Sequence, residues 1–156
     1  MYSKTSAAVG TDIKRPSLTG IHLEIYSDTV RASACDAFRM AVTEIKCNCG
    51  GKMSVTVPKQ SFFYLANAVE DKDLLEFGLN ANTLVFIKSD MLFSTRIISE
   101  PFMNIDRLLN MPDKMLVAKI KANDMKTMAE TVSMITNFSE DTAPAVSYTH
   151  LTLPTT

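Results

Sequence analysis

Two stretches of the chain carry side chains suited to recognition, and they lie far apart in the sequence. The first runs from Thr11 to Met40 and contains the basic turn Lys14-Arg15-Pro16 and the segment Asp36-Ala37-Phe38-Arg39-Met40. The second is Phe102–Leu109, with the sequence FMNIDRLL. If the two stretches meet, they form an apolar groove with two arginines on its rim, because a guanidinium can lie along an apolar wall and still donate hydrogen bonds. Such a groove favours binding of another protein over bond-breaking chemistry.

Each of these features also has a simpler structural explanation. Pro16 fixes its own φ and restricts Arg15 to extended geometry, which would hold Lys14 and Arg15 outward for contact with phosphate, but a solvated basic turn has the same pattern. Arg39 also fits an ordinary strand arginine in a surface salt bridge. Phe102–Leu109 on its own fits a short helical turn that covers a sheet edge.

The three cysteines give weak signals for chemistry. Cys47 and Cys49 could bind a metal, but a structural zinc site needs four ligands and the sequence offers no second pair, so we predict neither a metal nor a cofactor. Cys35 could act as a nucleophile with His22, which leaves a small cysteine hydrolase as an open alternative. An odd number of cysteines without a secretory signal argues against a disulfide framework.

Length and composition bound the class of protein. With 156 residues, 46% of them hydrophobic, and a net charge of −1, the chain has room for about one domain with a real core. No apolar run approaches the roughly 20 residues of a membrane-spanning helix, and the N-terminus lacks the apolar region of a secretory signal. These features favour a cytoplasmic protein with no membrane contact. Binding to nucleic acid would then depend on a local basic surface rather than on total charge.

Hydrophobic periodicity predicts a β-rich domain in the first two thirds of the chain. Most of this region alternates between apolar and polar residues, as strands do, whereas Phe62 to Val69 follows the spacing of an amphipathic helix. Met1 to Val9 could be the end of an earlier helix. Strands are expected over residues 21–25, 30–34, 38–47, 53–57, 74–79, 83–88 and 91–98.

A second, shorter unit is expected after the first. Residues 1–111 form the first predicted domain, residues 112–115 a linker, and residues 116–145 the start of another domain. That start comprises a strand at Leu116–Ile120 and a helix capped by Asn123. Residues 146–156 (VSYTHLTLPTT) show no usable periodicity, so we interpret them as a non-native or disordered tail.

Four segments together resemble the middle domain of the bacterial DNA polymerase III β sliding clamps. They are TDIKRPSLTGIHLEI, ACDAFRMA, VTVPKQSFFYLANAV and MLFSTRIISEPFMNIDRLL, and the resemblance runs from about Ser3 to Leu109. Residues 116–136 resemble the start of the third domain of these clamps. The resemblance implies an α+β DNA-clamp fold, an antiparallel sheet of βαβββ repeats with helices on one face. It also implies that the fold is truncated here, with the first strand of the middle domain missing.

The resemblance further implies a DNA sliding clamp, a processivity factor in replication that is not itself an enzyme. In this family a homodimeric ring encircles duplex DNA without reading its sequence. Partners such as the polymerase III α subunit, the clamp loader and repair factors insert short apolar peptides into a cleft between the second and third domains. Matched residue by residue, the DNA-facing side chains would be Arg15, Lys14, Lys59, Gln60 and Lys4. The second-domain side of the peptide cleft would be Leu18, Cys35, Ala37, Phe38, Arg39, Met40, Met103, Arg107 and Leu108.

The chain departs from this family in both halves of the expected cleft. The family often has Thr-Asp-Gly-His-Arg-Leu where this chain has Cys35 to Met40, and usually has proline and a basic residue where Met103 and Asp106 stand. Phe38 and Met103 keep the groove apolar, so peptide binding remains the expectation, with a different preferred peptide. A general peptide-binding module with no role on DNA remains the main alternative.

Overall fold

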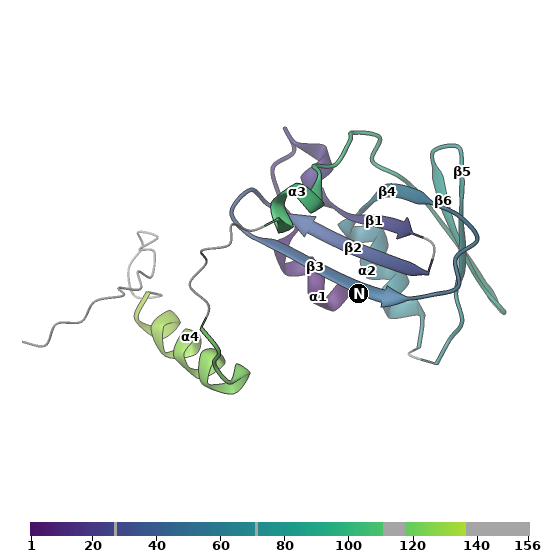
Figure 1. Cartoon of the computed structure of the whole chain (residues 1–156). Coiled ribbons are helices and arrows are strands. Elements are labelled where there is room, and N and C mark those ends of the chain that lie inside the picture. The colour runs from purple at the N-terminus through teal and green to yellow at the C-terminus, as the bar shows by residue number, and fades with distance from the viewer. Residues whose placement is uncertain (27, 71, 111–117, 137–156) are drawn as a thin grey trace, which may run out of the picture. The chain divides into compact units, whose positions relative to one another are not determined.

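The computed structural model describes residues 1–26, 28–70, 72–110 and 118–136. The chain divides into two compact units, Met1–Asn110 and Met111–Thr156 (Figure 1). The division falls one residue before the end of the first predicted domain. The predicted linker at 112–115 and the predicted tail at 146–156 lie outside the described residues.

The first unit is built on a four-stranded antiparallel sheet. Its strands are β1 (Gly20–Tyr26), β2 (Thr29–Cys35), β3 (Met40–Lys46) and β4 (Met53–Pro58), in the spatial order β3-β2-β1-β4. The alternation in the sequence fixes the register, since Leu23 pairs with Ala32 on one side and Val55 on the other, and all three are buried. The predicted strand 38–47 is shorter in the structure because a tight turn extends to Arg39.

A second antiparallel sheet completes this unit. It contains β5 (Glu76–Asn80), β6 (Thr83–Lys88) and β7 (Met91–Arg96), in the order β5-β6-β7. Beyond β7, an isolated bridge joins Ile98 to Thr56 of β4 and so links the two sheets. Leu84 and Phe86 of β6 belong to the same core cluster as Ile21 and Leu23 of β1, so the two sheets share one core.

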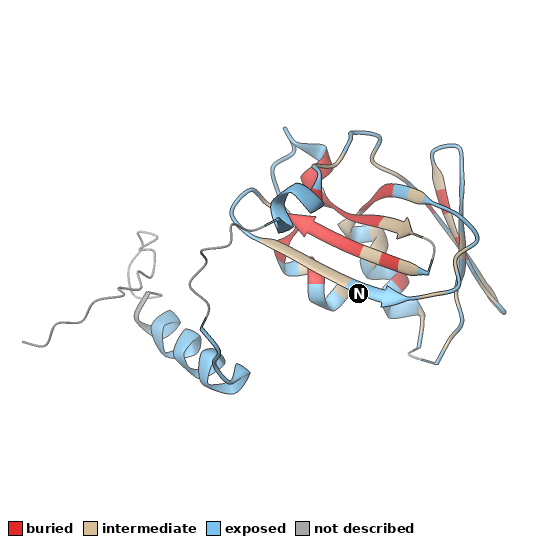
Figure 2. Ribbon diagram, viewed as in Figure 1, coloured by how far each residue is buried: buried red, intermediate tan, exposed pale blue. Residues whose placement is uncertain are grey.

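Two helical segments cover the inner face of the first sheet, the face on which Ile21, Leu23 and Ala32 lie. They are α1 (Tyr2–Thr5), continued by the 3-10 turn η1 (Ser6–Ala8), and α2 (Lys59–Ala68). The Tyr2 and Phe62 rings meet edge to face at 6.1 Å, which joins the two helices. Figure 2 shows that the buried residues concentrate in the strands that these helices cover. The predicted helix around Phe62–Val69 is confirmed. Residues 2–8 are helical as expected, and that they end an earlier helix stays a prediction.

Two short elements lie toward the opposite, outer face. One is α3 (Ile105–Leu109), which Figure 1 shows near the end of β2; the other short element, the 3-10 helix η2 (Pro16–Thr19), leads directly into β1. Asp106 of α3 contacts Arg31, and Arg31 points outward because its neighbours Val30 and Ala32 are buried on the inner face. The α+β fold class is therefore confirmed, with α1 and α2 on one face, whereas α3 packs on the other face rather than over a sheet edge.

The described part of the second unit is mainly one helix, α4 (Ala122–Thr136). The predicted strand at Leu116–Ile120 is wrong for residues 118–120, which have no regular structure, and its first two residues lie outside the described part. A strand needs a neighbour to satisfy its backbone groups, and the described residues of this unit supply none. Asn123 does not cap α4 but lies inside it, since the Met125 N–H donates to the carbonyl of Lys121. None of the described helices is long and apolar enough to cross a membrane.

Candidate functional site: the outer face of the first sheet

The turn between β2 and β3 is built around the Asp36 carboxylate. Its Oδ1 accepts hydrogen bonds from the N–H groups of Phe38 (3.1 Å) and Arg39 (3.0 Å), and its Oδ2 accepts one from Nε of Arg39 (2.6 Å). The hydrogen bond from the Arg39 side chain is the main cause that lowers the pKa of Asp36. Ala37 adopts a left-handed conformation with φ of 77°, which lets the chain reverse, and the Phe38 side chain is left 97% exposed.

Buried residues and a glycine join this turn to η2. The Gly10 N–H donates to the Leu18 carbonyl at 2.8 Å, and a Cβ at Gly10 would lie 3.2 Å from that oxygen and 3.4 Å from Cβ of Asp36. Leu18 and Cys35 are both buried. Only a residue without a side chain fits between these segments without displacing one of them, so Gly10 sets the distance between η2 and the turn.

The second predicted stretch meets the first on this face. The Phe102 ring stacks on His22 with 4.6 Å between centroids, and just before this stretch Glu100 Oε2 accepts a hydrogen bond of 3.0 Å from the N–H of Ser17. At the start of α3, Asn104 caps the helix by accepting from the N–H of Arg107 at 3.1 Å. The two stretches therefore lie together, as the sequence predicts.

Arg31 is the centre of a charged network on this face. Its Nε donates to Glu44 of β3 at 2.6 Å, and its Nη1 lies 2.6 Å from Asp106 of α3 and 3.6 Å from Glu24 of β1. The guanidinium also lies 4.9 Å from the centre of the Tyr26 ring, a cation–π distance. Burial alone would lower the pKa of Arg31, but the bonds to Glu44 and Asp106 outweigh it and raise that pKa.

His22 lines a polar cavity of about 430 Å³ beside this network. Its ring nitrogens lie 3.0 Å from the Thr56 hydroxyl and 3.2 Å from the Ser54 hydroxyl, and its Nε2 is 3.9 Å from Glu24. Burial lowers the pKa of His22, and the nearby Glu24 carboxylate only partly opposes that shift. Met103 also lines the cavity.

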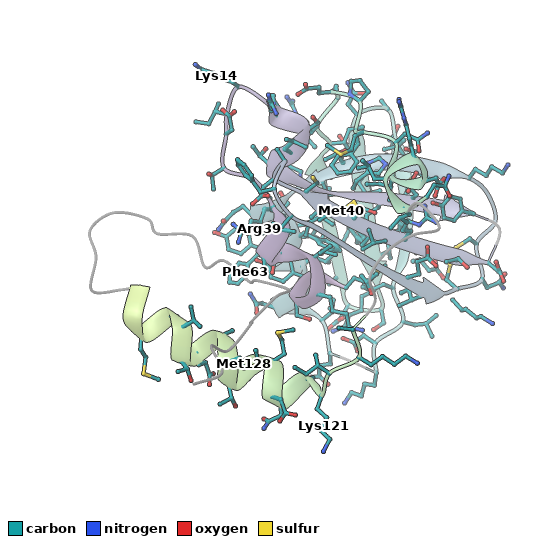
Figure 3. The ribbon with its side chains drawn as sticks, turned by 60° about the vertical axis from the view of Figure 1, so that its left-hand side comes forward. Lys14, Arg39, Met40, Phe63, Lys121 and Met128 are labelled. Atoms are coloured by element: carbon teal, nitrogen blue, oxygen red, sulfur yellow. A yellow bond between two sulfur atoms is a disulfide. The ribbon has the colours of Figure 1, made fainter. Side chains whose placement is uncertain are left out.

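The nine predicted cleft residues fall into three groups by exposure. Ala37, Phe38, Arg39, Arg107 and Leu108 are exposed, Met40 and Met103 are half-buried, and Leu18 and Cys35 are buried beneath the surface. Figure 3 shows Arg39 and Met40, which lie at the start of β3. Of the nine, only Met103 lines the 430 Å³ cavity. One hollow surrounded by six of them therefore stays a prediction: Leu18, Phe38, Arg39, Met103, Arg107 and Leu108.

The predicted DNA-facing residues lie on two parts of the first unit. Lys4 lies at the end of α1, and Lys59 and Gln60 begin α2, so these three belong to the helices of the inner face. Lys14 and Arg15 are exposed on a turn held by Asp12, and Figure 3 shows Lys14 at the tip of that loop. Within the described residues none of the four cations is in a salt bridge, which leaves each free to meet a phosphate.

The structure corrects one expectation about the cysteines. Cys47 and Cys49, considered in the sequence only as possible metal ligands, form a disulfide, whereas the odd cysteine count argued only against a disulfide framework. The count did not indicate this bond because it tests for a framework of bridges across the fold, and this bond closes only a local loop between β3 and β4. Cys35 remains a free thiol, and among the described residues no histidine contacts it, since both His22 nitrogens lie against hydroxyls.

Sequence reasoning missed Arg31 and its partners. Cross-strand pairing offered a partial signal, because Arg31 stands opposite Glu24 in β1 and Glu44 in β3, and opposite charges at such positions attract. The third carboxylate, that of Asp106, is 75 residues away in the sequence and gave no such signal. The stack of His22 on Phe102 was equally hidden, since it depends on the path of the chain after β7.

Comparison with known proteins matches this fold to one family. The family model described as the DNA polymerase III beta subunit, central domain, matches residues 1–104. The beta sliding clamp of Halalkalibacterium halodurans is 28% identical over 100 residues, which cover 61% of this chain and 26% of that protein. The beta sliding clamp of Lactococcus lactis is 26% identical over 112 residues, covering 70% of this chain and 30% of that protein.

Solved structures share the fold. The beta subunit of the DNA polymerase of Streptococcus pyogenes superposes with a TM-score of 0.75 at 21% identity, covering 89% of this chain and 38% of that one. The DNA polymerase sliding clamp of Bacillus subtilis superposes with a TM-score of 0.66 at 22% identity, covering 72% of this chain and 30% of that one. This chain thus spans under a third of the length of the two curated relatives. Since the family model covers most of the described first unit, the chain belongs to the family of DNA polymerase III beta subunit central domains.

Proposed function

We propose that this chain is part of a DNA sliding clamp, a processivity factor that encircles duplex DNA and has no catalytic activity of its own. The match of residues 1–104 to the central-domain family is the observation that carries the proposal. The shared fold with the Streptococcus pyogenes beta subunit supports it, because that likeness extends over 89% of the chain. In the whole protein, a homodimeric ring of such domains would hold the polymerase on DNA by topology rather than by tight binding.

The inner face would face the duplex. Lys4, Lys59 and Gln60 on α1 and α2 would lie toward the hole of the ring, and Lys14 and Arg15 would add cations from the loop before η2. Such groups contact phosphates and ignore base edges, which suits a ring that must slide over any sequence. The near-zero net charge does not oppose this role, since only the DNA-facing surface needs to be basic.

The outer face would hold the partners. Phe38 and Leu108 are exposed apolar side chains that can anchor a peptide, and Arg39 and Arg107 are exposed donors beside them. A short apolar segment of the polymerase III α subunit, the clamp loader or a repair factor would bind here. This arrangement needs no catalytic group, and the lack of a contact between Cys35 and a histidine in the described structure does not favour the cysteine hydrolase.

A topological experiment tests the clamp function. Residues 1–110 replace the matching central domain of the Streptococcus pyogenes beta subunit, and the folded chimera is loaded onto nicked circular DNA. We expect retention on the circle and rapid loss once the circle is cut, because a ring slides off a free end. Arg15→Glu with Lys59→Glu should shorten retention most at low salt.

The control is the unmodified Streptococcus beta subunit on the same DNA. A chimera that elutes as the same oligomer as this control, yet is lost equally fast from circular and cut DNA, would contradict the proposed function.

A further inference from the structure

We propose that Arg31 is a positioning residue that sets the distance between the two walls of the proposed peptide cleft, an inference that rests on the proposed function. One wall begins at Arg39 and Met40, where β3 starts, and the other is α3 with Arg107 and Leu108. Arg31 lies on β2, opposite Glu44 of β3 and in contact with Asp106 of α3.

The guanidinium uses different nitrogens for the two walls. Nε binds Glu44 of β3 at 2.6 Å and Nη1 binds Asp106 of α3 at 2.6 Å. The guanidinium fork is planar and rigid, so fixing one nitrogen against β3 also fixes the direction in which the other reaches α3. The stack of the guanidinium on Tyr26 limits its rotation further.

The α3 helix needs such an anchor. It has only five residues, far fewer than an isolated helix requires for stability in water. Within the described residues, the helix is also held by Ile105, which is 2% exposed, and its N-terminus by the Asn104 Oδ1, which accepts from the Arg107 N–H. The stack of Phe102 on His22 holds the segment just before it. These contacts fix the start of the helix, so the Arg31–Asp106 pair sets the direction in which Arg107 and Leu108 point.

The surroundings make this pair stronger than an ordinary surface salt bridge. The Arg31 side chain is only 14% exposed, which reduces screening by water and salt, although Asp106 itself is 67% exposed. Glu24, at 3.6 Å, adds a third carboxylate to a single guanidinium. Without Arg31 the three carboxylates would repel one another, and that repulsion would push α3 away from the sheet.

Three variants test the inference in the full 156-residue chain. Asp106→Asn keeps the side-chain shape but loses the charge-assisted bond to Arg31. The probe is a fluorescent peptide with the C-terminus of a bacterial polymerase III α subunit, and its Kd should rise about five-fold. Arg31→Lys should raise the Kd similarly, because an ammonium cannot bridge Glu44 and Asp106 as the fork does. Asp106→Glu should recover part of the affinity.

Asp73→Asn is the matched control. It removes the carboxylate of another partly buried ion pair, that of Asp73 Oδ2 with Lys88 Nζ at 2.9 Å, which is remote from α3. The control should leave the peptide Kd unchanged. Equal Kd values for Asp106→Asn, Arg31→Lys and the wild type would overturn the inference while leaving the proposed cleft in place.

Hydrogen exchange separates failure of this inference from failure of the proposed function. In Asp106→Asn the Asn110 N–H, which donates to the Asp106 carbonyl at 3.1 Å, should exchange several-fold faster, while the β1–β2 ladder stays protected. If the wild type binds no peptide but the Asn110 N–H still exchanges faster in Asp106→Asn, the proposed peptide cleft is wrong. The positioning of α3 by Arg31 would then still stand. Unchanged exchange at Asn110 would count against Arg31 whatever the peptide does.

Discussion

The two faces of the first sheet are held by different kinds of interaction. On the inner face, Ile21, Leu23 and Val57 pack under α1 and α2 with almost no exposure. On the outer face, the contacts are polar and specific, and they join segments that are far apart in the chain, such as Ser17 with Glu100 and Arg31 with Asp106. The inner face therefore supplies most of the stability, and the outer face supplies the positions of the side chains proposed to bind partners.

The largest expected effect is on the inner face. Ile21 is 0% exposed and sits in the shared core, so Ile21→Ala should lower the free energy of unfolding by about 2–5 kcal/mol, through lost burial and the cavity left behind. Urea denaturation of the full chain measures this effect. A decrease in the free energy of unfolding well below 1 kcal/mol would contradict the difference drawn between the two faces, because the inner face would then contribute little to stability.

A smaller loss of stability, arising from His22 on the outer face, is expected when the pH falls. Burial lowers the pKa of His22 in the folded chain below the usual 6.5, so the unfolded chain takes up the proton first. The stability that neutral His22 contributes is therefore complete above pH 6.5 and is lost as the pH falls below that value toward the folded pKa. Glu24, which lies 3.9 Å from the ring, opposes this trend and limits it.

Two measurements check the behaviour of His22. The chain has two histidines, and His22→Gln identifies which imidazole resonance belongs to position 22. That resonance should titrate at a pH below 6.5, and urea stability should fall on acidification less in His22→Gln than in the wild type. A His22 resonance that titrates above 6.5 would reverse the sign and would show that Glu24, not burial, controls the ring.

The inner face was predictable from sequence because its information is local. Alternation along β1 and the helical spacing of Phe62 and Leu65 identify the residues that must be buried, and the structure confirms those elements. The ends of elements were less predictable. The strand expected from Phe38 begins only at Met40, because the side chain of Asp36 holds the intervening residues in a turn.

The outer face was predictable only in part. The resemblance to a known family indicated that residues 11–40 and 102–109 meet, and the stack of His22 on Phe102 agrees. No periodicity could indicate that Asp106 would bind Arg31, since the pair depends on where the chain returns after the second sheet. The Cys47–Cys49 disulfide escaped prediction for another reason, because counting cysteines says nothing about a bond closed within one turn.

The most direct test of the account is peptide binding by two matched pairs of variants, one pair at the proposed cleft and one on the second sheet. Leu108→Ala and Arg39→Ala remove the proposed anchor and donor, whereas Leu92→Ala and Arg96→Ala remove exposed residues of the same types from β7. With the fluorescent polymerase peptide, fluorescence anisotropy should show a Kd at least about ten-fold weaker for each of the first two variants. The β7 variants should bind like the wild type. Equal losses in both pairs, or no loss in either, would contradict a peptide site on the outer face of the first sheet.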